Sequence, residues 1–375
     1  MRWLPALLCL GLALAQAPEV WLTGAPVPSS FVEQAARRGL EWAGLVANLP
    51  QQSSLGFGER REVPLGTATL YLTQAPYPPH RTTQLLLSND PESIPATRGL
   101  FHYRFANGEG MRLIYHHKNT SEGLLNLEVR IFNPSPEVVW IWVSDAMAGP
   151  VPDEVYAGHV ATKRWLELYW NQVGQLVELP PNSERSLSRL ALRPGTVVSG
   201  ILEAVVTRGS AAVLDMVAKA PQEADPPLET YQQGRVYRLD TLETRVQKTH
   251  IAGGSTFLTL GDGAFKASDG KQIAGNWGMF YTYDLELQNP TPTPQTVGFR
   301  VIAAGGIARG VIWLEGQAYE LPLLRPGQTY DLPSRTVPPG TRQRVTLSTL
   351  PASGSNYPLR LLLYNPLATA GQGAP

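Results

Sequence analysis

The chain has 375 residues, with 31 basic and 31 acidic side chains and a single cysteine. A zero net charge without a basic cluster argues against binding to nucleic acid or to an anionic membrane surface. The length exceeds what one sandwich core normally encloses, so we expect two domains.

The N-terminus has the pattern of a signal peptide, residues 1–15. Met1 and Arg2 are followed by an apolar run that is too short for a membrane span, which needs about 20 residues. A small-x-small pattern predicts cleavage after Ala15. We therefore expect export to the periplasm, the cell surface or the medium, without a transmembrane anchor. Cleavage would remove Cys9, the only cysteine, and with it any disulfide or thiolate chemistry.

Residues 28–47 are the clearest helix in an N-terminal segment that we place at residues 16–50. Apolar side chains recur on one face with helical spacing. Ser30 and Glu33 have the spacing of a capping box, in which each side chain covers a free backbone N–H.

Short strand-like runs separated by turn residues fill most of the remaining chain, as in antiparallel sandwiches. We expect strands at residues 67–73, 83–88, 99–105, 111–116, 125–132, 137–143, 185–192, 196–207, 236–240, 256–260, 279–288, 296–303, 310–314, 342–350 and 359–364. Asn107 and Gly108 between two of them predict a hairpin.

A repeated motif divides these strands into two sets. Asn133-Pro134-Ser135-Pro136 and Asn289-Pro290-Thr291-Pro292 each lie between two alternating runs, and a Pro-Pro turn follows each. Proline cannot lie inside a central strand, and asparagine can start a turn, so we interpret the motif as a rigid connection.

The repeat predicts two tandem Ig-like antiparallel β-sandwich domains, preceded by a short N-terminal helix. We place the first domain at residues 51–217 and the second at residues 231–366. The charged, proline-rich stretch 218–230 is the expected linker, and residues 367–375 are the expected disordered tail.

The block at residues 149–172 has no counterpart in the second repeat. As a helix it would place Trp165, Leu168 and Tyr169 on one face; as a hairpin it would alternate Leu166, Leu168 and Trp170. We favour the helix.

Histidines of the first domain are the candidates for a metal site. His116 and His117 end one predicted strand, and neighbours on a strand face opposite ways, so only one would reach a given site. Together with His159 and Asp153 they supply the donor types that a transition metal uses. The alternative is that these histidines are hydrogen-bonded structural residues, and we expect no cofactor.

Tryptophans are the candidates for a ligand site. Trp140 and Trp142 share one face of a strand and could stack on a sugar, or could be covered as core. Trp165 and Trp170 would supply that cover or extend the platform.

Nucleophile elbows, zinc-protease motifs and P-loops are missing, so enzyme activity is unsupported. We expect a non-catalytic structural, adhesive or binding protein of the cell envelope. The alternatives are a carbohydrate-binding protein that uses exposed aromatics, and a metal-binding protein or metal-dependent hydrolase. The expected partners are a cell-wall or surface polysaccharide or another envelope protein.

Five segments carry a resemblance to a group of exported bacterial proteins of unknown function. They are residues 90–105, 112–121, 155–167, 275–316 and 350–364. Some members carry an added domain similar to the N-terminal domain of copper amine oxidases, which has no counterpart in this chain. Trp277 stands where the group has tyrosine in a Gly-Asn-Tyr-Gly motif. The resemblance implies export and tandem β domains, and it implies no activity.

Overall fold

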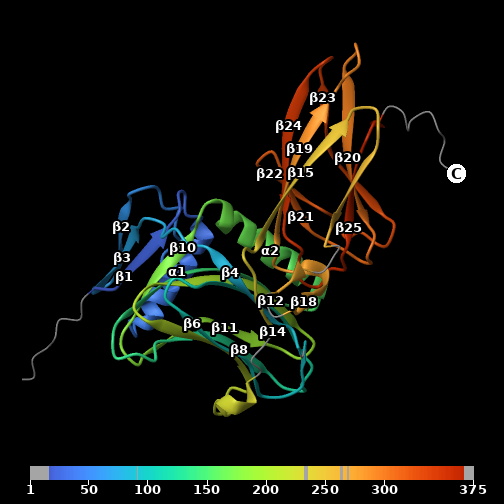
Figure 1. Ribbon diagram of the computed structural model, residues 1–375. Coiled ribbons are helices and arrows are strands. Elements are labelled where there is room, and N and C mark those ends of the chain that lie inside the picture. The colour runs from blue at the N-terminus through green and yellow to red at the C-terminus, as the bar shows by residue number, and fades with distance from the viewer. Residues whose placement is uncertain (1–16, 91, 232–234, 262–264, 268–269, 367–375) are drawn as a thin grey trace, which may run out of the picture.

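The computed structural model describes residues 17–90, 92–231, 235–261, 265–267 and 270–366 (Figure 1). The predicted signal peptide and C-terminal tail lie outside these residues. The described chain is mainly β, with several sheets and two α-helices.

A ten-stranded sheet and a four-stranded sheet form the N-terminal body. The large sheet has the order β14 (Arg235–Arg238), β4 (Thr82–Ser88), β7 (Gly110–Asn119), β12 (Val197–Arg208), β9 (Val139–Val151), β10 (Gly174–Leu179), β1 (Glu19–Thr23), β3 (Ala68–Gln74) and β2 (Arg60–Leu65), with β5 (Ser93–Ile94) beside β7. The small sheet has the order β11 (Glu184–Leu192), β8 (Leu125–Phe132), β13 (Ala211–Lys219) and β6 (Arg98–Ala106). Their inner faces share one apolar core, to which Phe101, Leu127 and Ile141 contribute.

Two helices cover the outer face of the large sheet (Figure 1): α1 (Ser29–Trp42) and α2 (Glu154–Trp170). The helix expected at residues 149–172 is therefore confirmed. The apolar alternation on both faces of β9 has the same explanation, since one face meets the small sheet and the other meets α2.

The C-terminal part is a second pair of sheets, which rises from this body in Figure 1. One has the order β15 (Glu243–Ile251), β19 (Phe280–Gln288), β24 (Arg342–Thr349), β21 (Val311–Leu314) and β22 (Gln317–Glu320). The other has the order β16 (Thr256–Leu260), β25 (Leu359–Tyr364), β20 (Gln295–Ala303) and β23 (Thr329–Val337). The short elements η1 (Leu228–Thr230), β17 (Phe265–Lys266), β18 (Gln272–Ile273) and η2 (Ala274–Asn276) complete the chain.

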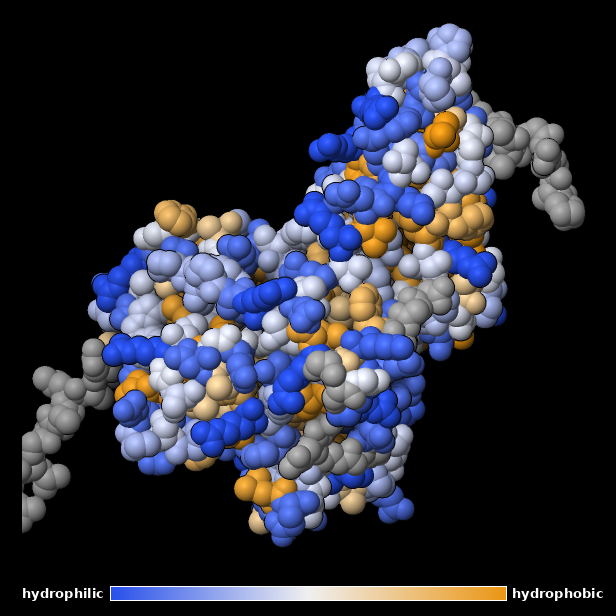
Figure 2. Space-filling model, in the orientation of Figure 1, coloured by the Kyte–Doolittle hydropathy of each residue, from blue (hydrophilic) through white to orange (hydrophobic). Residues whose placement is uncertain are grey.

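One apolar cluster runs from the outer face of the large sheet into this C-terminal part. Ile114, Trp165, Met279 and Phe280 all belong to it. A Cβ on Gly278 would lie 2.6 Å from side-chain carbons of Leu85 and of Ile114, so the two parts pack closely. On the face shown in Figure 2, apolar residues gather on the C-terminal part, among more polar surroundings.

Each repeated Asn-Pro turn joins two facing sheets, and a buried asparagine holds it. Asn133 Nδ2 donates to the carbonyls of Glu137 at 2.7 Å and Leu179 at 3.0 Å, and Oδ1 accepts from Ser135 N at 2.9 Å. Asn289 repeats these bonds with Thr293, Val337 and Thr291, and Asn119 repeats them with Gly123, Leu192 and Ser121. We call these three residues the clasp asparagines; the third is not apparent from the Asn-Pro motif.

Several local predictions are wrong for identifiable reasons. The Ser30–Glu33 capping box is absent, because Pro28 precedes the helix without a side-chain cap and Glu33 pairs with Arg37 at 2.6 Å. The helix stops at Trp42 because Gly44, at φ 67°, allows a C-terminal turn in which Leu45 N bonds to Leu40 O.

The hairpin expected at Asn107 and Gly108 is a crossing between sheets, since β6 pairs with β13 and β7 pairs with β12 and β4. The sheets are also not purely antiparallel: β1 with β3, β4 with β7 and β15 with β19 are parallel pairs.

The sheets do not follow the expected boundaries at residues 51 and 231. The segment 16–50 supplies β1 as well as a helix, and β1 pairs with β10 and β3. Residues Arg235–Arg238, expected in the second domain, form β14 at the edge of the large sheet. The stretch 218–230 contains the end of β13 and η1.

Candidate functional site

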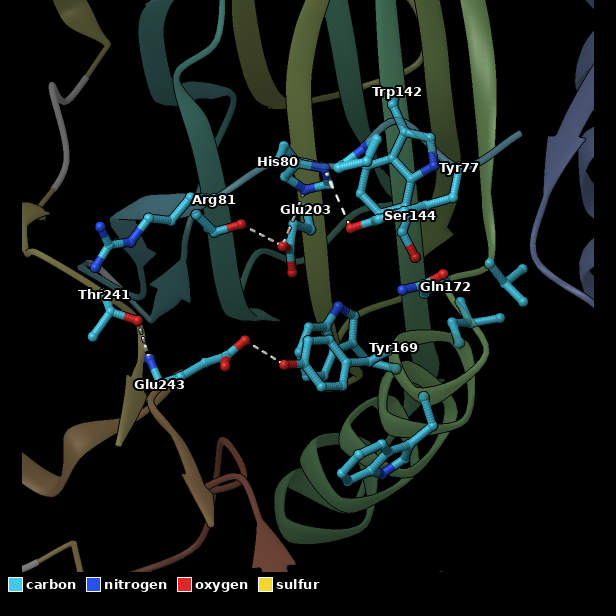
Figure 3. A pocket seen from close by; sticks show the side chains of 16 residues that line it. Tyr77, His80, Arg81, Trp142, Ser144, Tyr169, Gln172, Glu203, Thr241 and Glu243 are labelled. Atoms are coloured by element: carbon cyan, nitrogen blue, oxygen red, sulfur yellow. Dashed lines mark hydrogen bonds and ion pairs between the residues drawn. The ribbon is translucent and has the colours of Figure 1, made fainter. Parts of the chain in front are cut away.

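A cavity of about 490 Å³ opens between the outer face of the large sheet, the end of α2, the loop before β4 and the start of β15. Figure 3 shows its polar side chains pointing toward one another from these elements. Tyr77, Trp142, Ser144, Glu203 and Glu243 are among the residues that line it.

The floor of the cavity consists of side chains that point outward from the large sheet, because alternate residues of a strand face opposite sides. Trp142 and Ser144 lie on the outer face of β9, while Val143 between them joins the inner core. Glu203 on β12 lies directly opposite Ser144 of β9 and opposite Arg112 of β7. Three neighbouring strands thus set Arg112, Glu203 and Ser144 in one row across the sheet.

Glu203 is the buried charge of the site, and only 6% of it is exposed. Arg112 donates to its Oε2 from Nε at 3.2 Å and from Nη2 at 3.1 Å, and Thr82 Oγ1 donates to Oε1. His80 Nε2 lies 3.5 Å from Oε1. Burial alone would raise the pKa of Glu203, but Arg112 and the bonds from His80 and Thr82 lower that pKa to about 2.

Arg112 also connects the site to the C-terminal part. Its Nη1 donates to Gly278 O at 2.7 Å, and its guanidinium carbon lies 4.4 Å from the centre of the Trp165 ring. The guanidinium of Arg112 can be buried here because it bonds to the Glu203 carboxylate and the Gly278 carbonyl and stacks on the Trp165 ring.

Aromatic rings form the wall, but only one of the tryptophans presents much surface. Trp142 is 4% exposed, donates from Nε1 to Thr23 Oγ1 at 2.9 Å, and packs against His80 at 4.7 Å between ring centres. Trp165 is 1% exposed and stacks on Tyr169. Trp170, at 42% exposure, is the ring that a ligand could cover.

Tyr169 and Glu243 form the side of the cavity toward the C-terminal part. Tyr169 Oη donates to Glu243 Oε1. Burial first, and then this bond, raise the pKa of Tyr169, so its hydroxyl stays protonated at neutral pH.

The structure brings three of the four candidate tryptophans to the same cavity, namely Trp142, Trp165 and Trp170. Trp140 lies apart, half-buried against Trp21 at 5.1 Å between ring centres.

The candidate metal ligands are dispersed. His117 bonds to Ser88 Oγ at 2.9 Å, His159 Nε2 lies 3.0 Å from Glu320 Oε2, and Asp153 caps α2 by accepting from Tyr156 N. His116 points elsewhere, toward Glu92. Within the described ranges, no group of three or more His, Cys, Asp or Glu side chains is placed to hold a metal ion.

Sequence reasoning missed Glu203, Arg112 and His80. The available signal was a single charged residue inside an apolar strand pattern, as in residues 197–207, because such a residue needs a buried partner. His80 lies in a proline-rich loop, where no periodicity indicates a direction.

Glu203 is suited to a fixed negative charge rather than to transferring protons. Glu203 is ionised at neutral pH and its oxygens already accept from fixed donors, whereas a general acid or base needs a pKa near the working pH.

The fold and this cavity define a mainly β, sandwich-forming protein with a ligand-sized site. Among the described residues, no helix combines the length and apolarity that crossing a bilayer requires. No family model matches the chain, and no curated protein matches it.

Solved structures give only weak likenesses. An anti-sigma factor domain-containing protein is 10% identical with a TM-score of 0.20, covering 72% of this chain and 86% of that one. Tripeptidyl peptidase 2 is 11% identical with a TM-score of 0.20, covering 79% and 24%. The tandem CBM22 domains of Paenibacillus barcinonensis Xyn10C are 9% identical with a TM-score of 0.16, covering 73% and 91%. Likenesses at this level carry no argument about function.

Proposed function

We propose that the protein is an exported, non-catalytic binding protein of the cell envelope, and that the cavity beside α2 holds one unit of a saccharide. The frame would be two tandem Ig-like sandwiches. The matching clasp asparagines support this arrangement, since Asn133 and Asn289 hold equivalent crossings in the two halves.

The cavity itself is the observation that carries the proposal. Its volume of about 490 Å³ lies within the roughly 300–1,000 Å³ typical of ligand pockets. Trp170 offers an exposed apolar ring for one face of a sugar, and Ser144, Gln172 and Glu243 line the same cavity with polar groups for hydroxyls. One exposed ring beside convergent polar groups favours a single sugar unit over stacking along a chain.

Charge supports a neutral ligand. The buried Glu203 is already paired with Arg112, and Glu243 accepts a hydrogen bond from Tyr169, so the deepest carboxylate of the cavity does not require a cationic ligand. Glu243 retains acceptor capacity for sugar hydroxyls, because an ionised carboxylate has about four lone-pair positions and, among the described residues, only Tyr169 donates to it. The oxygens of Glu203, in contrast, are taken by Arg112, Thr82 and His80.

Sequence patterns support the location. The predicted signal peptide and the resemblance to exported bacterial proteins both favour the envelope, where wall and surface polysaccharides are accessible partners.

A glycan-array screen of the protein without residues 1–15 tests the proposal. We expect a restricted set of glycans to bind, and Trp170→Ala to abolish their signal. Trp21→Ala removes a half-buried tryptophan outside the cavity and should leave the signal intact. Binding to no glycan, or equal binding by Trp170→Ala, would favour a purely structural or adhesive role.

A further inference from the structure

A second cavity of about 340 Å³ lies at the junction of the two halves and shares no lining residue with the first. The ends of β4 and β7 and the start of α2 form one side. Trp277 and the loop 353–356 form the other. The contact around it is tight: a Cβ on Gly354 would lie 2.6 Å from Glu154 O and 3.3 Å from His116 Cε1.

His116 is the unusual residue of this cavity. It is 5% exposed, lines the cavity, and neither Nδ1 nor Nε2 has a hydrogen-bond partner. Glu92 Oε1 lies 3.7 Å from His116 Nε2, beyond hydrogen-bond distance. Burial lowers the pKa of His116 to about 4, so the ring is neutral at physiological pH and offers one donor and one acceptor.

Two further buried polar atoms of the lining residues are also unpaired. They are Asn89 Oδ1, from the large-sheet side, and Trp277 Nε1, from the C-terminal side. An unsatisfied buried polar atom costs about 1–3 kcal/mol, so native proteins normally supply a partner. All four unpaired atoms belong to residues that line this one cavity, which makes it the candidate place for a polar molecule that would pair with them.

Charge indicates which kind of molecule fits. Glu92 and Glu154 are the carboxylates of the lining, and Lys118 Nζ donates to Glu154 at 2.8 Å. Among the described residues, Glu92 has no such bond: Lys118 acts on it only at longer range, and its near neighbour His116 is neutral. Burial, and secondly Glu154, raise the pKa of Glu92, and the attraction of Lys118 only partly opposes them.

We propose that this cavity binds a small organic cation bearing an ammonium group. The ammonium would donate to Glu92 and to Asn89 Oδ1, and the unpaired nitrogens of His116 and Trp277 would meet a polar group on the same molecule. An ammonium has three donors and no acceptor, which matches a lining with an incompletely compensated carboxylate. This site stands independently of the saccharide proposal.

Calorimetric titration with ethanolamine tests the site, and ethylene glycol is the matched probe in which a hydroxyl replaces the ammonium. We expect saturable binding of ethanolamine and at least about tenfold weaker binding of ethylene glycol, a difference of about 1.4 kcal/mol. Equal binding of the two probes would overturn the cationic assignment. Absence of ethanolamine binding at millimolar concentration would mean that the cavity holds only water.

Variants locate the binding within the fold. Glu92→Gln keeps the size of the half-exposed side chain and should weaken ethanolamine binding about tenfold. Trp277→Phe keeps a ring, removes the N–H donor, and should weaken it by a smaller factor. Glu62→Gln, on an exposed position of β2, should leave it unchanged. Loss of binding in this control, or no loss in Glu92→Gln, would contradict the assignment.

Discussion

At the scale of single residues, the clasp asparagines show how one side chain can fix a crossing between sheets. Each is fully buried or nearly so, and each bonds the backbone of its own turn and of the strand that returns beside it. Backbone carbonyls at such crossings have left one sheet and not yet joined the other, so the amide supplies their partner.

Replacing a clasp asparagine should therefore be costly. Asn289→Ala would leave the buried carbonyl of Val337 and the amide of Thr291 without their partner. We expect a loss of at least about 2 kcal/mol in the free energy of unfolding, measured by urea denaturation. Asn171→Ala removes one exposed bond to Glu167 O and should cost less than about 1 kcal/mol. Equal losses in the two variants would refute the role of the clasp.

The pair Arg112 and Glu203 gives a second prediction at this scale. Arg112→Met would leave the buried Glu203 carboxylate unpaired and should destabilise the protein by about 3–5 kcal/mol in denaturant unfolding. Adding Glu203→Gln to that variant should recover part of the loss, because the remaining group is neutral. A double variant less stable than Arg112→Met would contradict this explanation.

The sequence predicts the tryptophans of the site better than its charges. Alternation in residues 137–143 and helical spacing in residues 149–172 predict that Trp165 lies over the face of the strand that carries Trp142, and both line the cavity. Glu203 and Arg112 meet because β12 pairs with β7. The periodicity of a strand predicts which side chains share a face, but it does not predict which other strand pairs with it.

At the scale of elements, helix α2 packs against sheets of both halves of the molecule. It lies on β9 and β12, its N-terminal residue Glu154 lines the junction cavity, and its C-terminal Trp170 lines the first cavity. Gly158 permits this position, since a Cβ there would lie 1.7 Å from Ser353 O.

Gly158→Ala should reverse the usual effect of removing a glycine from a helix. Alanine normally favours a helix by about 1 kcal/mol over glycine. Here the clash with a backbone oxygen should lower the unfolding temperature and expose the loop near Ser353 to limited proteolysis. Gly123→Ala, which meets no atom within 4 Å, should change neither readout. A more stable Gly158→Ala variant would show that α2 does not pack against this loop.

Strand positions are largely predictable from the sequence, whereas strand partners are not. The expected strands at residues 125–132, 256–260 and 359–364 match β8, β16 and β25. β15 escaped prediction because most of its side chains are polar and exposed, so no buried face marks it. The hairpin at residue 107 failed because turn chemistry does not distinguish a hairpin from a crossing.

At the scale of the whole molecule, the two halves share an apolar cluster and enclose a buried histidine between them. The pKa of His116 is lowered from 6.5 to about 4 in the folded protein. The unfolded chain therefore binds more protons between those values, and stability should fall as the pH falls from 6.5 toward 4. The raised pKa of Glu92 acts in the opposite direction and reduces the effect.

Comparison with His116→Asn isolates this contribution. Between pH 6.5 and 5, the wild-type protein should lose up to about 2 kcal/mol more unfolding free energy than the variant, as measured by urea denaturation. Parallel pH profiles would show that His116 is not held neutral by burial.

The most direct test of the proposed function is a crystal structure of the protein bound to the glycan that gives the strongest signal on the array. We predict one sugar unit against Trp170 in the cavity beside α2, with hydroxyls bonded to Ser144, Gln172 or Glu243. A glycan bound at another surface, with only ordered water in this cavity, would contradict the proposed function.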